Sequence, residues 1–294
     1  MVYRIRHTTT YTYSTPVSVC HNELRLRPRD CRQQTCTFHE LLVFPKPTAF
    51  NPVLDYFGNT VTFFALQESH QALTMTANSM VTLTPVDIPL LTAPPAWEDV
   101  RERLRRDRSV AGLEAYQYVF DSPYVSTSPA LRVYALPSFA PGRPLLDAVW
   151  DLTRRIHIDF TYTPQATSIH TPLDEVLQDR RGVCQDFAQV QIGCLRALGL
   201  AARYVSGYLV RQPAPDHAPP LETQASHAWI AVYCPGYGWV DVDPTNNVFP
   251  LAGHITVAYG RDYGDVSPIK GVFFGGGEQT MEVTVDVMSV TSQE

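Results

Sequence analysis

The stretch "RRGVCQDFAQVQIGCLRALGL", residues 180–200, decides the fold because its pattern is the clearest helix in the chain. Its apolar residues recur at helical spacing, at Phe187, Val190, Cys194 and Leu198. Gly182 lets the backbone approach another molecule closely, and Cys184 follows in the first turn of the predicted helix. The positive end of a helix dipole favours a thiolate, so Cys184 is a candidate nucleophile. Cys194, on the apolar stripe, is predicted to be a core residue.

After this helix the apolar residues alternate with a period of two, which predicts an antiparallel sheet. The alternation covers residues 201–210, 226–235 and 237–244. His227 lies on the second strand, sharing a face with Trp229, and is either a general base or a core histidine. Asp241 and Asp243 point the same way from the third strand, so the turn "PGYG" would bring either carboxylate beside His227. Among the other histidines only His254, at the start of "HITVAY", has a comparable context.

Composition limits the class of protein. The 294 residues are 45% hydrophobic and 18% charged, which is typical of a well-packed globular chain. The net charge of −6 gives no reason to expect nucleic acid or an anionic membrane as a partner. The basic run at 100–109 is interrupted by acidic residues and is interpreted as a solvated helix face.

The six cysteines are predicted to be reduced. The N-terminal residues contain no apolar core of signal-peptide length, so we expect a cytoplasmic protein in which disulfides are rare. A zinc site needs four ligands at tight paired spacings, and Cys31 with Cys36 forms only a loose pair. We therefore expect no metal and no organic cofactor.

Two domains joined by helices are expected. Short alternating strands with Pro, Asn and Gly between them fill residues 1–90, where Gly58 and Asn59 predict a hairpin turn. A Pro-rich connector at 85–97 marks the boundary, and residues 91–140 are assigned to a helical linker. Residues 141–294 are assigned to the catalytic core together with its C-terminal strands. The fold class is therefore α+β.

Three ordered blocks carry a family resemblance. They are "RRGVCQDFAQVQIGCLRALGLAARYVSGY", "SHAWIAVYCPGYGWVDVDPTNN" and "HITVAYGRDYGDVSPIKGVFFGGG". Together they resemble the bacterial transglutaminase-like family over about residues 140–275. The resemblance implies a transglutaminase/papain-like cysteine protease core, in which the helix carrying the cysteine packs on an antiparallel sheet. It also implies an N-terminal β-sandwich-like domain.

The resemblance assigns roles to individual residues. It makes Cys184 the nucleophile, His227 the general base and acid, and Asp243, not Asp241, the carboxylate that orients His227. It implies the backbone N–H of Cys184 as the first oxyanion donor. Tyr162 in "DFTYTP" is a candidate second donor, with simple packing as the equal alternative.

The expected function is acyl transfer to Cys184 from a peptide or protein substrate, followed by hydrolysis. Amine transfer of the protein-glutamine type is the first alternative, ranked lower because no calcium-binding loop is present in the sequence. A catalytically silent peptide-binding module is an alternative of another class. The sequence leaves the substrate and the oligomeric state open.

Overall fold

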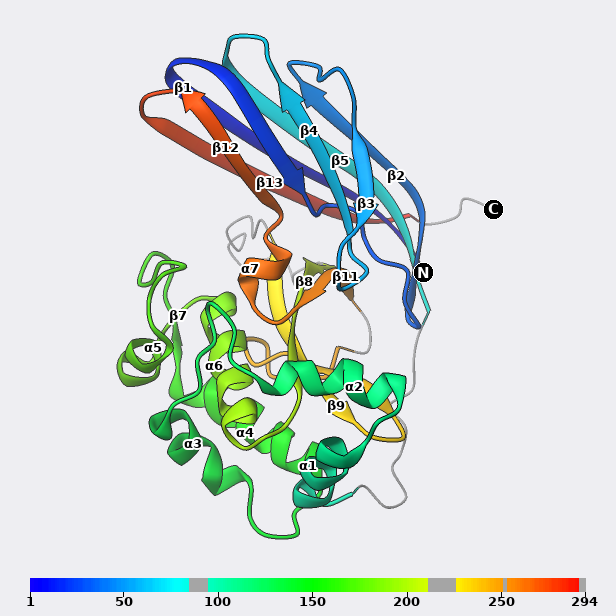
Figure 1. Cartoon of the computed structure of the whole chain (residues 1–294), viewed down its shortest axis with the longest axis vertical. Helices are drawn as coiled ribbons and strands as arrows, with labels where there is room; N and C mark the ends of the chain where they lie inside the picture. The colour runs from blue at the N-terminus through cyan, green and yellow to red at the C-terminus, as the bar shows by residue number, and fades with distance from the viewer. Residues whose placement is uncertain (85–94, 211–225, 251–252, 291–294) are drawn as a thin grey trace, which may run out of the picture.

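The computed structural model describes residues 1–84, 95–210, 226–250 and 253–290 (Figure 1). A layer of long strands, built from both ends of the chain, lies above a helical half that contains a smaller sheet. Most of the predicted connector at 85–97, and all of residues 211–224, lie outside the described residues. Every described helix is too short or too polar to cross a membrane.

The N-terminal layer is one curled antiparallel sheet. Its strands are β1 (Val2–Leu24), β2 (Gln34–Phe44), β3 (Asn51–Leu54), β4 (Thr60–Leu66), β5 (His70–Leu83), β12 (Ile269–Gly275) and β13 (Gln279–Val290). The first part of β1, to Tyr13, pairs with β5 and β13, whereas its last part, from Val17, pairs mainly with β4 and β12. The register shift between Thr12 and Val17 bends β1. The sheet therefore encloses its own core, which includes Phe64 and Met75.

The C-terminal strands join this sheet and not the helical half. The alternating pattern of 279–290 predicts a strand but says nothing of its partner, and its partner is β1 from the other end of the chain. The short strands predicted within residues 1–90 are also partly merged, because β1 is one long strand of 23 residues. The domain boundaries at 90 and 140 stay a prediction.

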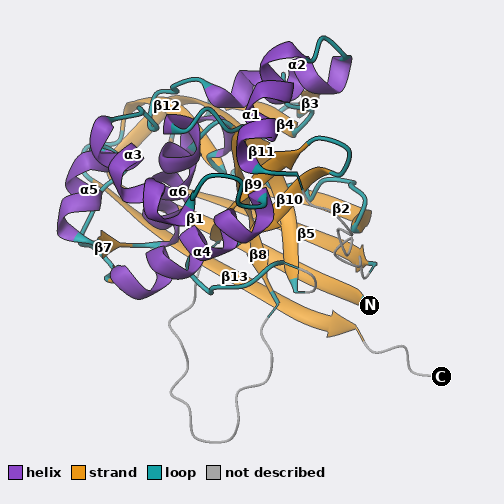
Figure 2. Ribbon diagram, turned by 90° about the horizontal axis from the view of Figure 1, so that it is seen from below, coloured by secondary structure: helices purple, strands orange, loops and turns teal. Residues whose placement is uncertain are grey.

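Helices surround α6 in the lower half (Figure 2). They are α1 (Trp97–Arg106), α2 (Val110–Tyr116), α3 (Pro129–Ala135), α4 (Leu145–Asp159), α5 (Leu173–Asp179) and α6 (Cys184–Ala197), with 3-10 turns at Gln117–Val119 and Leu136–Ser138. Helix α1 buries one side, with Trp97, Val100 and Leu104. Helix α6 is buried along most of its length against α3, α4 and α5, and it ends before Gly199 at a positive φ of 80°.

The second sheet is the predicted antiparallel one. Its order is β10 (Gly238–Val242), β9 (His227–Cys234), β8 (Ala202–Leu209) and β11 (His254–Gly260). One face, with Tyr204 and Ile230, belongs to the main core and covers α6. The other face carries Val205, Trp229 and Tyr259. Two short elements complete this half: β6 (Thr161–Tyr162) pairs in parallel with β7 (Arg181–Gly182), and α7 (Tyr263–Val266) follows β11.

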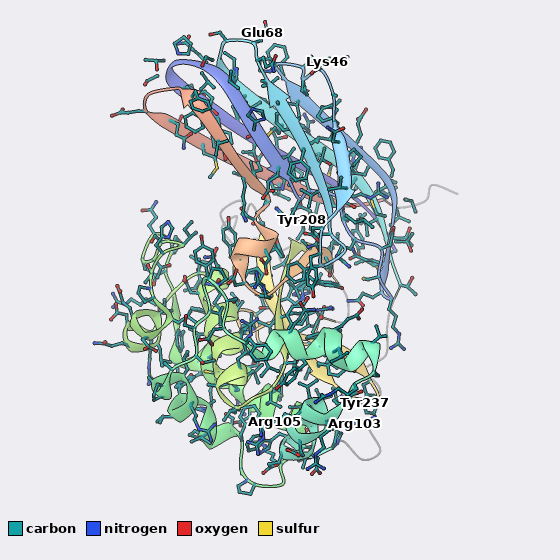
Figure 3. All side chains as sticks on the ribbon, viewed as in Figure 1. Lys46, Glu68, Arg103, Arg105, Tyr208 and Tyr237 are labelled. Carbon is teal, nitrogen blue, oxygen red and sulfur yellow. The ribbon has the colours of Figure 1, made fainter. Side chains whose placement is uncertain are left out.

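Two side-chain amides of the N-terminal half protect the free edge of β11. Gln34 bonds both the N–H (2.8 Å) and the C=O (2.6 Å) of Thr256. Asn59 does the same to Tyr259, with 2.8 Å for each bond. Edge strands otherwise expose unpaired backbone groups, so these amides satisfy β11 and join the two halves. Tyr208, which lies between the halves in Figure 3, adds a buried bond of 2.8 Å from its hydroxyl to His7.

Candidate active site

The start of α6 places Cys184. Cys184 is the first residue of the helix, as predicted, and is partly exposed. The carboxylate of Asp186 accepts hydrogen bonds from the N–H of Val183 (2.8 Å) and the hydroxyl of Thr167 (2.6 Å). A Cβ on Gly182 would lie 2.4 Å from Oδ2 of Asp186. Gly182 is therefore required by Asp186, which closes the first turn, and this is a different reason from the close approach inferred from sequence.

His227 begins β9 and is almost completely buried, at 3% exposure. Its Nε2 lies 2.8 Å from Oδ2 of Asp243. Its ring stacks beside Trp229 with 6.0 Å between ring centres, as their shared strand face predicts. Its Nδ1 is buried and has no hydrogen-bond partner within the geometric limits among the described residues. Asp243 therefore engages one ring nitrogen and leaves the other for a different group.

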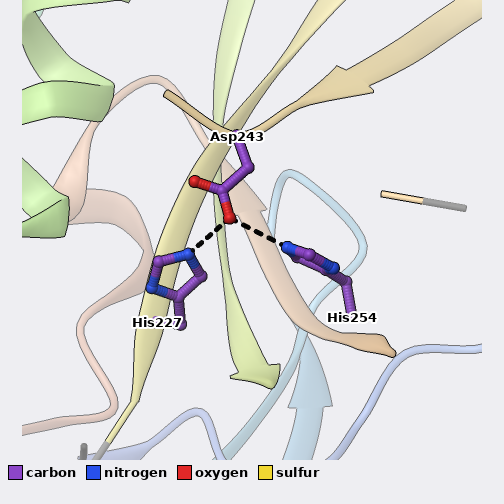
Figure 4. A group of neighbouring side chains, drawn as sticks. All are labelled: His227, Asp243 and His254. Atoms are coloured by element: carbon purple, nitrogen blue, oxygen red, sulfur yellow. Dashed lines mark hydrogen bonds and ion pairs between the residues drawn. The ribbon is translucent and has the colours of Figure 1, made fainter. Parts of the chain in front are cut away.

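Asp243 is fully buried and accepts five hydrogen bonds (Figure 4 shows two). Oδ2 receives Nε2 of His227, Nε2 of His254 (2.9 Å) and Nδ2 of Asn246 (2.7 Å). Oδ1 receives the backbone N–H groups of Thr245 (2.9 Å) and Asn246 (3.1 Å). Burial opposes the charge, but the hydrogen bonds from His227 and His254 hold the pKa of Asp243 well below its usual value.

Asp241 has a different environment from Asp243. Its Oδ2 accepts the indole N–H of Trp229 at 3.2 Å, and burial raises its pKa. Antiparallel pairing of β9 with β10 across the "PGYG" turn is what brings both carboxylates near β9. Of the two aspartates proposed from sequence, the structure thus places Asp243 on His227.

His227 interacts electrostatically with Cys184. Burial lowers the pKa of His227, but the hydrogen bond to Asp243 and the interaction with Cys184 outweigh it and raise the pKa to about 10. The imidazolium form is therefore favoured at neutral pH. Because Nε2 is held by Asp243, Nδ1 is the nitrogen that remains for the thiol of Cys184. The structure brings all three residues singled out by sequence into one group.

His254 is the member of the group that sequence reasoning did not assign. It begins β11, on the opposite edge of the sheet from β10, and its ring centre lies 5.0 Å from that of Trp229. Its position on an alternating strand was visible in the sequence. Its contact with Asp243 depends on how the turn after β10 crosses the sheet, which no local pattern encodes.

Two tyrosines lie near the cysteine. Tyr162, the candidate oxyanion donor, pairs with Gly182 across β6 and β7, and its ring is 6.3 Å from that of Phe187. Its catalytic role stays a prediction. Tyr204, which sequence reasoning did not consider, is buried on β8. Burial raises the pKa of Tyr204 well above its usual value, and the charge of Cys184 acts in the same direction.

One described group of side chains has the composition of a metal site. His227, Asp243 and His254 offer ligand atoms within 4.8 Å of one another, and two imidazoles with a carboxylate suit zinc. In this arrangement, however, both Nε2 atoms are directed at the same oxygen of Asp243, so the donors satisfy one another. All six cysteines are free thiols, and none joins this group.

Comparison with known proteins places this geometry in a family. Residues 3–82 match the model of the bacterial transglutaminase-like N-terminal region, and residues 138–244 match the core model of the transglutaminase-like superfamily. The chain belongs to the transglutaminase-like superfamily. The core match contains Cys184, His227 and Asp243, whereas His254 follows it.

Relatives in the superfamily differ in how much of this chain they share. A Mycobacterium tuberculosis protein without a functional name is 39% identical over 97% of this chain and 92% of its own length. A Mycobacterium leprae protein is 32% identical over 97% of both chains. A Pseudomonas aeruginosa protein named protein-glutamine gamma-glutamyltransferase is 37% identical over 103 residues, which are 34% of this chain and 15% of that protein.

A solved structure shares the fold of this chain over its whole length. A Cytophaga hutchinsonii structure described as a "Putative Cysteine Protease" superposes with a TM-score of 0.74 at 21% identity, covering 100% of this chain and 92% of that one. The likeness confirms the predicted α+β fold, with a transglutaminase-like core and an N-terminal strand domain.

Proposed function

We propose that this protein is a cysteine-dependent acyl-transfer enzyme that hydrolyses peptide or amide bonds with Cys184, His227 and Asp243. The observation that carries the proposal is the position of His227. Its ring is buried with the carboxylate of Asp243 on Nε2, and Asp243 and Cys184 together raise its pKa to about 10. A nucleophile, a base and an orienting acid in this order form the recurring arrangement of thiol acyl transfer.

The reaction follows from these positions. The thiolate of Cys184 attacks the carbonyl carbon, and the imidazolium of His227 donates its Nδ1 proton to the leaving amine as the C–N bond breaks. The neutral imidazole then takes a proton from water, which attacks the thioester and releases the acid. Asp243 holds the imidazole in position and stabilises its positive charge throughout.

The oxyanion of each intermediate needs two donors. As the first residue of α6, Cys184 has a backbone N–H without an acceptor inside the helix, and it is the first donor we propose. Tyr162 and Tyr204 are the two candidates for the second. Tyr162→Phe and Tyr204→Phe, compared with the parent chain, separate them, because the loss of such a donor lowers turnover by about 10²–10³.

Hydrolysis and amine transfer share every step up to the thioester. The name of the Pseudomonas aeruginosa relative favours transfer, and the description of the Cytophaga hutchinsonii counterpart favours hydrolysis. The test traps the acyl group on Cys184 from a peptide library by mass spectrometry. The trapped enzyme is then divided between buffer alone and buffer with a primary amine. Free acid in both portions supports hydrolysis, whereas an amide formed with the amine supports transfer.

This experiment needs two control variants. Cys184→Ala must abolish the adduct, and Cys194→Ala, which removes a fully buried thiol on the same helix, must leave it unchanged. Absence of any adduct, together with ordinary thiol reactivity of Cys184 toward iodoacetamide, supports the catalytically silent peptide-binding module instead. Stoichiometric zinc in the purified protein would support a metal site at His227, Asp243 and His254. The cytoplasmic location stays a proposal, and cell fractionation tests it.

A further inference from the structure

A second pocket lies between the two halves of the molecule. It encloses about 440 Å³, and its walls include Arg29, Phe57, Tyr118, Arg203, Trp239 and Tyr259. Clefts of this size, lined by aromatic rings with a few polar groups, are typical of small-ligand sites. The pocket contains no residue of the candidate active site, and Arg203 and Trp239 adjoin the sheet face opposite α6.

Arg203 lines this pocket with its guanidinium packed on two aromatic rings. Its guanidinium carbon lies 3.6 Å from the ring centre of Tyr259 and 4.3 Å from that of Trp239. Its Nε is buried without an acceptor, and within the described residues its side chain makes no ion pair. Asp241 is close enough to interact electrostatically, but its Oδ2 is directed to Trp229. The rings cover the flat faces of the guanidinium, so its N–H edge is what remains for a ligand.

Arg29 brings a second positive charge to the same place. Its guanidinium carbon lies 4.5 Å from the ring centre of Tyr259, and its Nη1 donates to the backbone oxygen of Phe57 at 3.0 Å. Its Nε is also buried without an acceptor. Burial lowers the pKa of Arg29 and the charge of Arg203 lowers it further, whereas Tyr259 and Asp55 act in the opposite direction. The two guanidinium groups thus repel each other inside an aromatic pocket.

Two neighbouring positive charges with buried, unused N–H donors are costly unless an anion compensates them. Guanidinium groups pair with carboxylate and phosphate through two parallel hydrogen bonds. We infer that this pocket binds a small organic anion. Its carboxylate or phosphate group meets Arg29 and Arg203, and its apolar part lies against Tyr118 and Trp239. The exposed carboxylate of Glu114 at the rim is the one acidic group in the lining.

The test uses the whole chain and three probes. Isothermal titration calorimetry and tryptophan fluorescence follow the addition of phenyl phosphate, benzoate and, as the uncharged control, phenol. We expect saturable binding of both anions and none of phenol, and the stronger of the two anions identifies the headgroup. Binding changes the fluorescence of Trp239, because the anion contacts the guanidinium that stacks on this ring.

Variants locate the binding. Arg203→Met should weaken anion binding by about tenfold or more, since it removes charge-assisted hydrogen bonds. Arg103→Met, on the exposed surface of α1 (Figure 3), is the matched control and should bind like the parent chain. Glu114→Gln removes the acidic group at the exposed rim and should tighten anion binding by about two- to fivefold. This variant provides the test if Arg203→Met does not fold.

The inference is overturned if neither anion binds at millimolar concentration. It is also overturned if the affinity is the same in the parent chain and a folded Arg203→Met, or if Glu114→Gln does not tighten binding when Arg203→Met fails to fold. None of these readouts depends on turnover at Cys184, so the outcome is independent of the proposed acyl-transfer reaction.

Discussion

Asp243→Asn is the substitution that tests the candidate site most directly. The amide is the same size as the carboxylate, so the change removes the charge without opening a cavity. Its oxygen can still accept the two backbone N–H groups that bond Oδ1. Its nitrogen, however, replaces the oxygen that now accepts from His227, His254 and Asn246. Three donors then lose their acceptor in a fully buried place.

The structure sets the size of the effect. The change in the pKa of His227 from 6.5 to about 10 corresponds to roughly 5 kcal/mol in favour of the imidazolium, most of it from Asp243 and Cys184 together. Removing one partner of a buried ion pair costs about 3–5 kcal/mol of folding stability. In a chain of this length, such a loss lowers the melting temperature by of order 10 °C. Without its orienting carboxylate, a triad of this type loses about 10⁴ in turnover.

The sign of the pH dependence follows from the two pKa directions. The raised pKa of His227 contributes stability that is complete below 6.5 and is lost as the pH rises through about 10. The lowered pKa of Asp243 contributes stability that is complete above its ordinary value and is lost as the pH falls through the lowered one. The melting temperatures of the parent chain and Asp243→Asn should therefore differ most between about pH 4 and 6.5, and should converge toward pH 10.

The assay combines melting curves across pH with an NMR titration of the His227 ring. Asp243→Asn leaves burial as the dominant influence, so the pKa of His227 should fall far below 10. Asp241→Asn is the matched control, because Asp241 is the neighbouring buried aspartate and accepts from Trp229 instead of His227. If the titration of His227 is unchanged in Asp243→Asn, or if Asp241→Asn has the larger effect, the assignment of Asp243 is refuted.

Three further substitutions test the supporting structure. Gly182→Ala should slow alkylation of the reactive cysteine by iodoacetamide at least several-fold, because the new methyl group collides with the carboxylate of Asp186; an unchanged rate would contradict this reason for the glycine. Asn59→Leu removes both hydrogen bonds to Tyr259 at the edge of β11. We expect it to lower the free energy of unfolding, measured in urea, by about 1–3 kcal/mol. A change near zero would contradict the role of this amide in joining the two halves. His254→Phe deletes one donor to the buried carboxylate, so turnover should fall by about tenfold while substrate affinity holds; a change in affinity alone would assign His254 to substrate binding.

Local patterns were sufficient for the elements of the catalytic half. The 3.6-residue period of α6 and the two-residue period of β8, β9 and β10 arise from which side chains must be buried, and burial is what the sequence records. The short turn at 235–238 also made the pairing of β9 with β10 predictable, and with it the approach of either Asp241 or Asp243 to His227. The order of chemistry-bearing residues along the chain was therefore informative, because neighbouring elements carry them.

Contacts between distant segments were not predictable in the same way. The alternation of β13 records one buried face but not the identity of the neighbouring strand, and β1 lies more than 260 residues earlier. The pairing of Gln34 with Thr256 joins β2 to β11, strands of different halves, so neither residue has a local signal. The same holds for the meeting of Arg29 with Arg203 on the ring of Tyr259.

The sequence by itself determined the placement of Cys184 at a helix start, the strand that carries His227 and the pair of aspartates, Asp241 and Asp243, on the next strand. Each depends on periodicity or on a short turn, which are local consequences of hydrophobic burial and backbone geometry. Only the tertiary structure decided that His254 shares the carboxylate of Asp243, that both chain ends build one sheet, and that two arginines line a pocket. These features depend on long-range packing, in which the partner of a buried group is set by the whole fold and not by its neighbours in the chain.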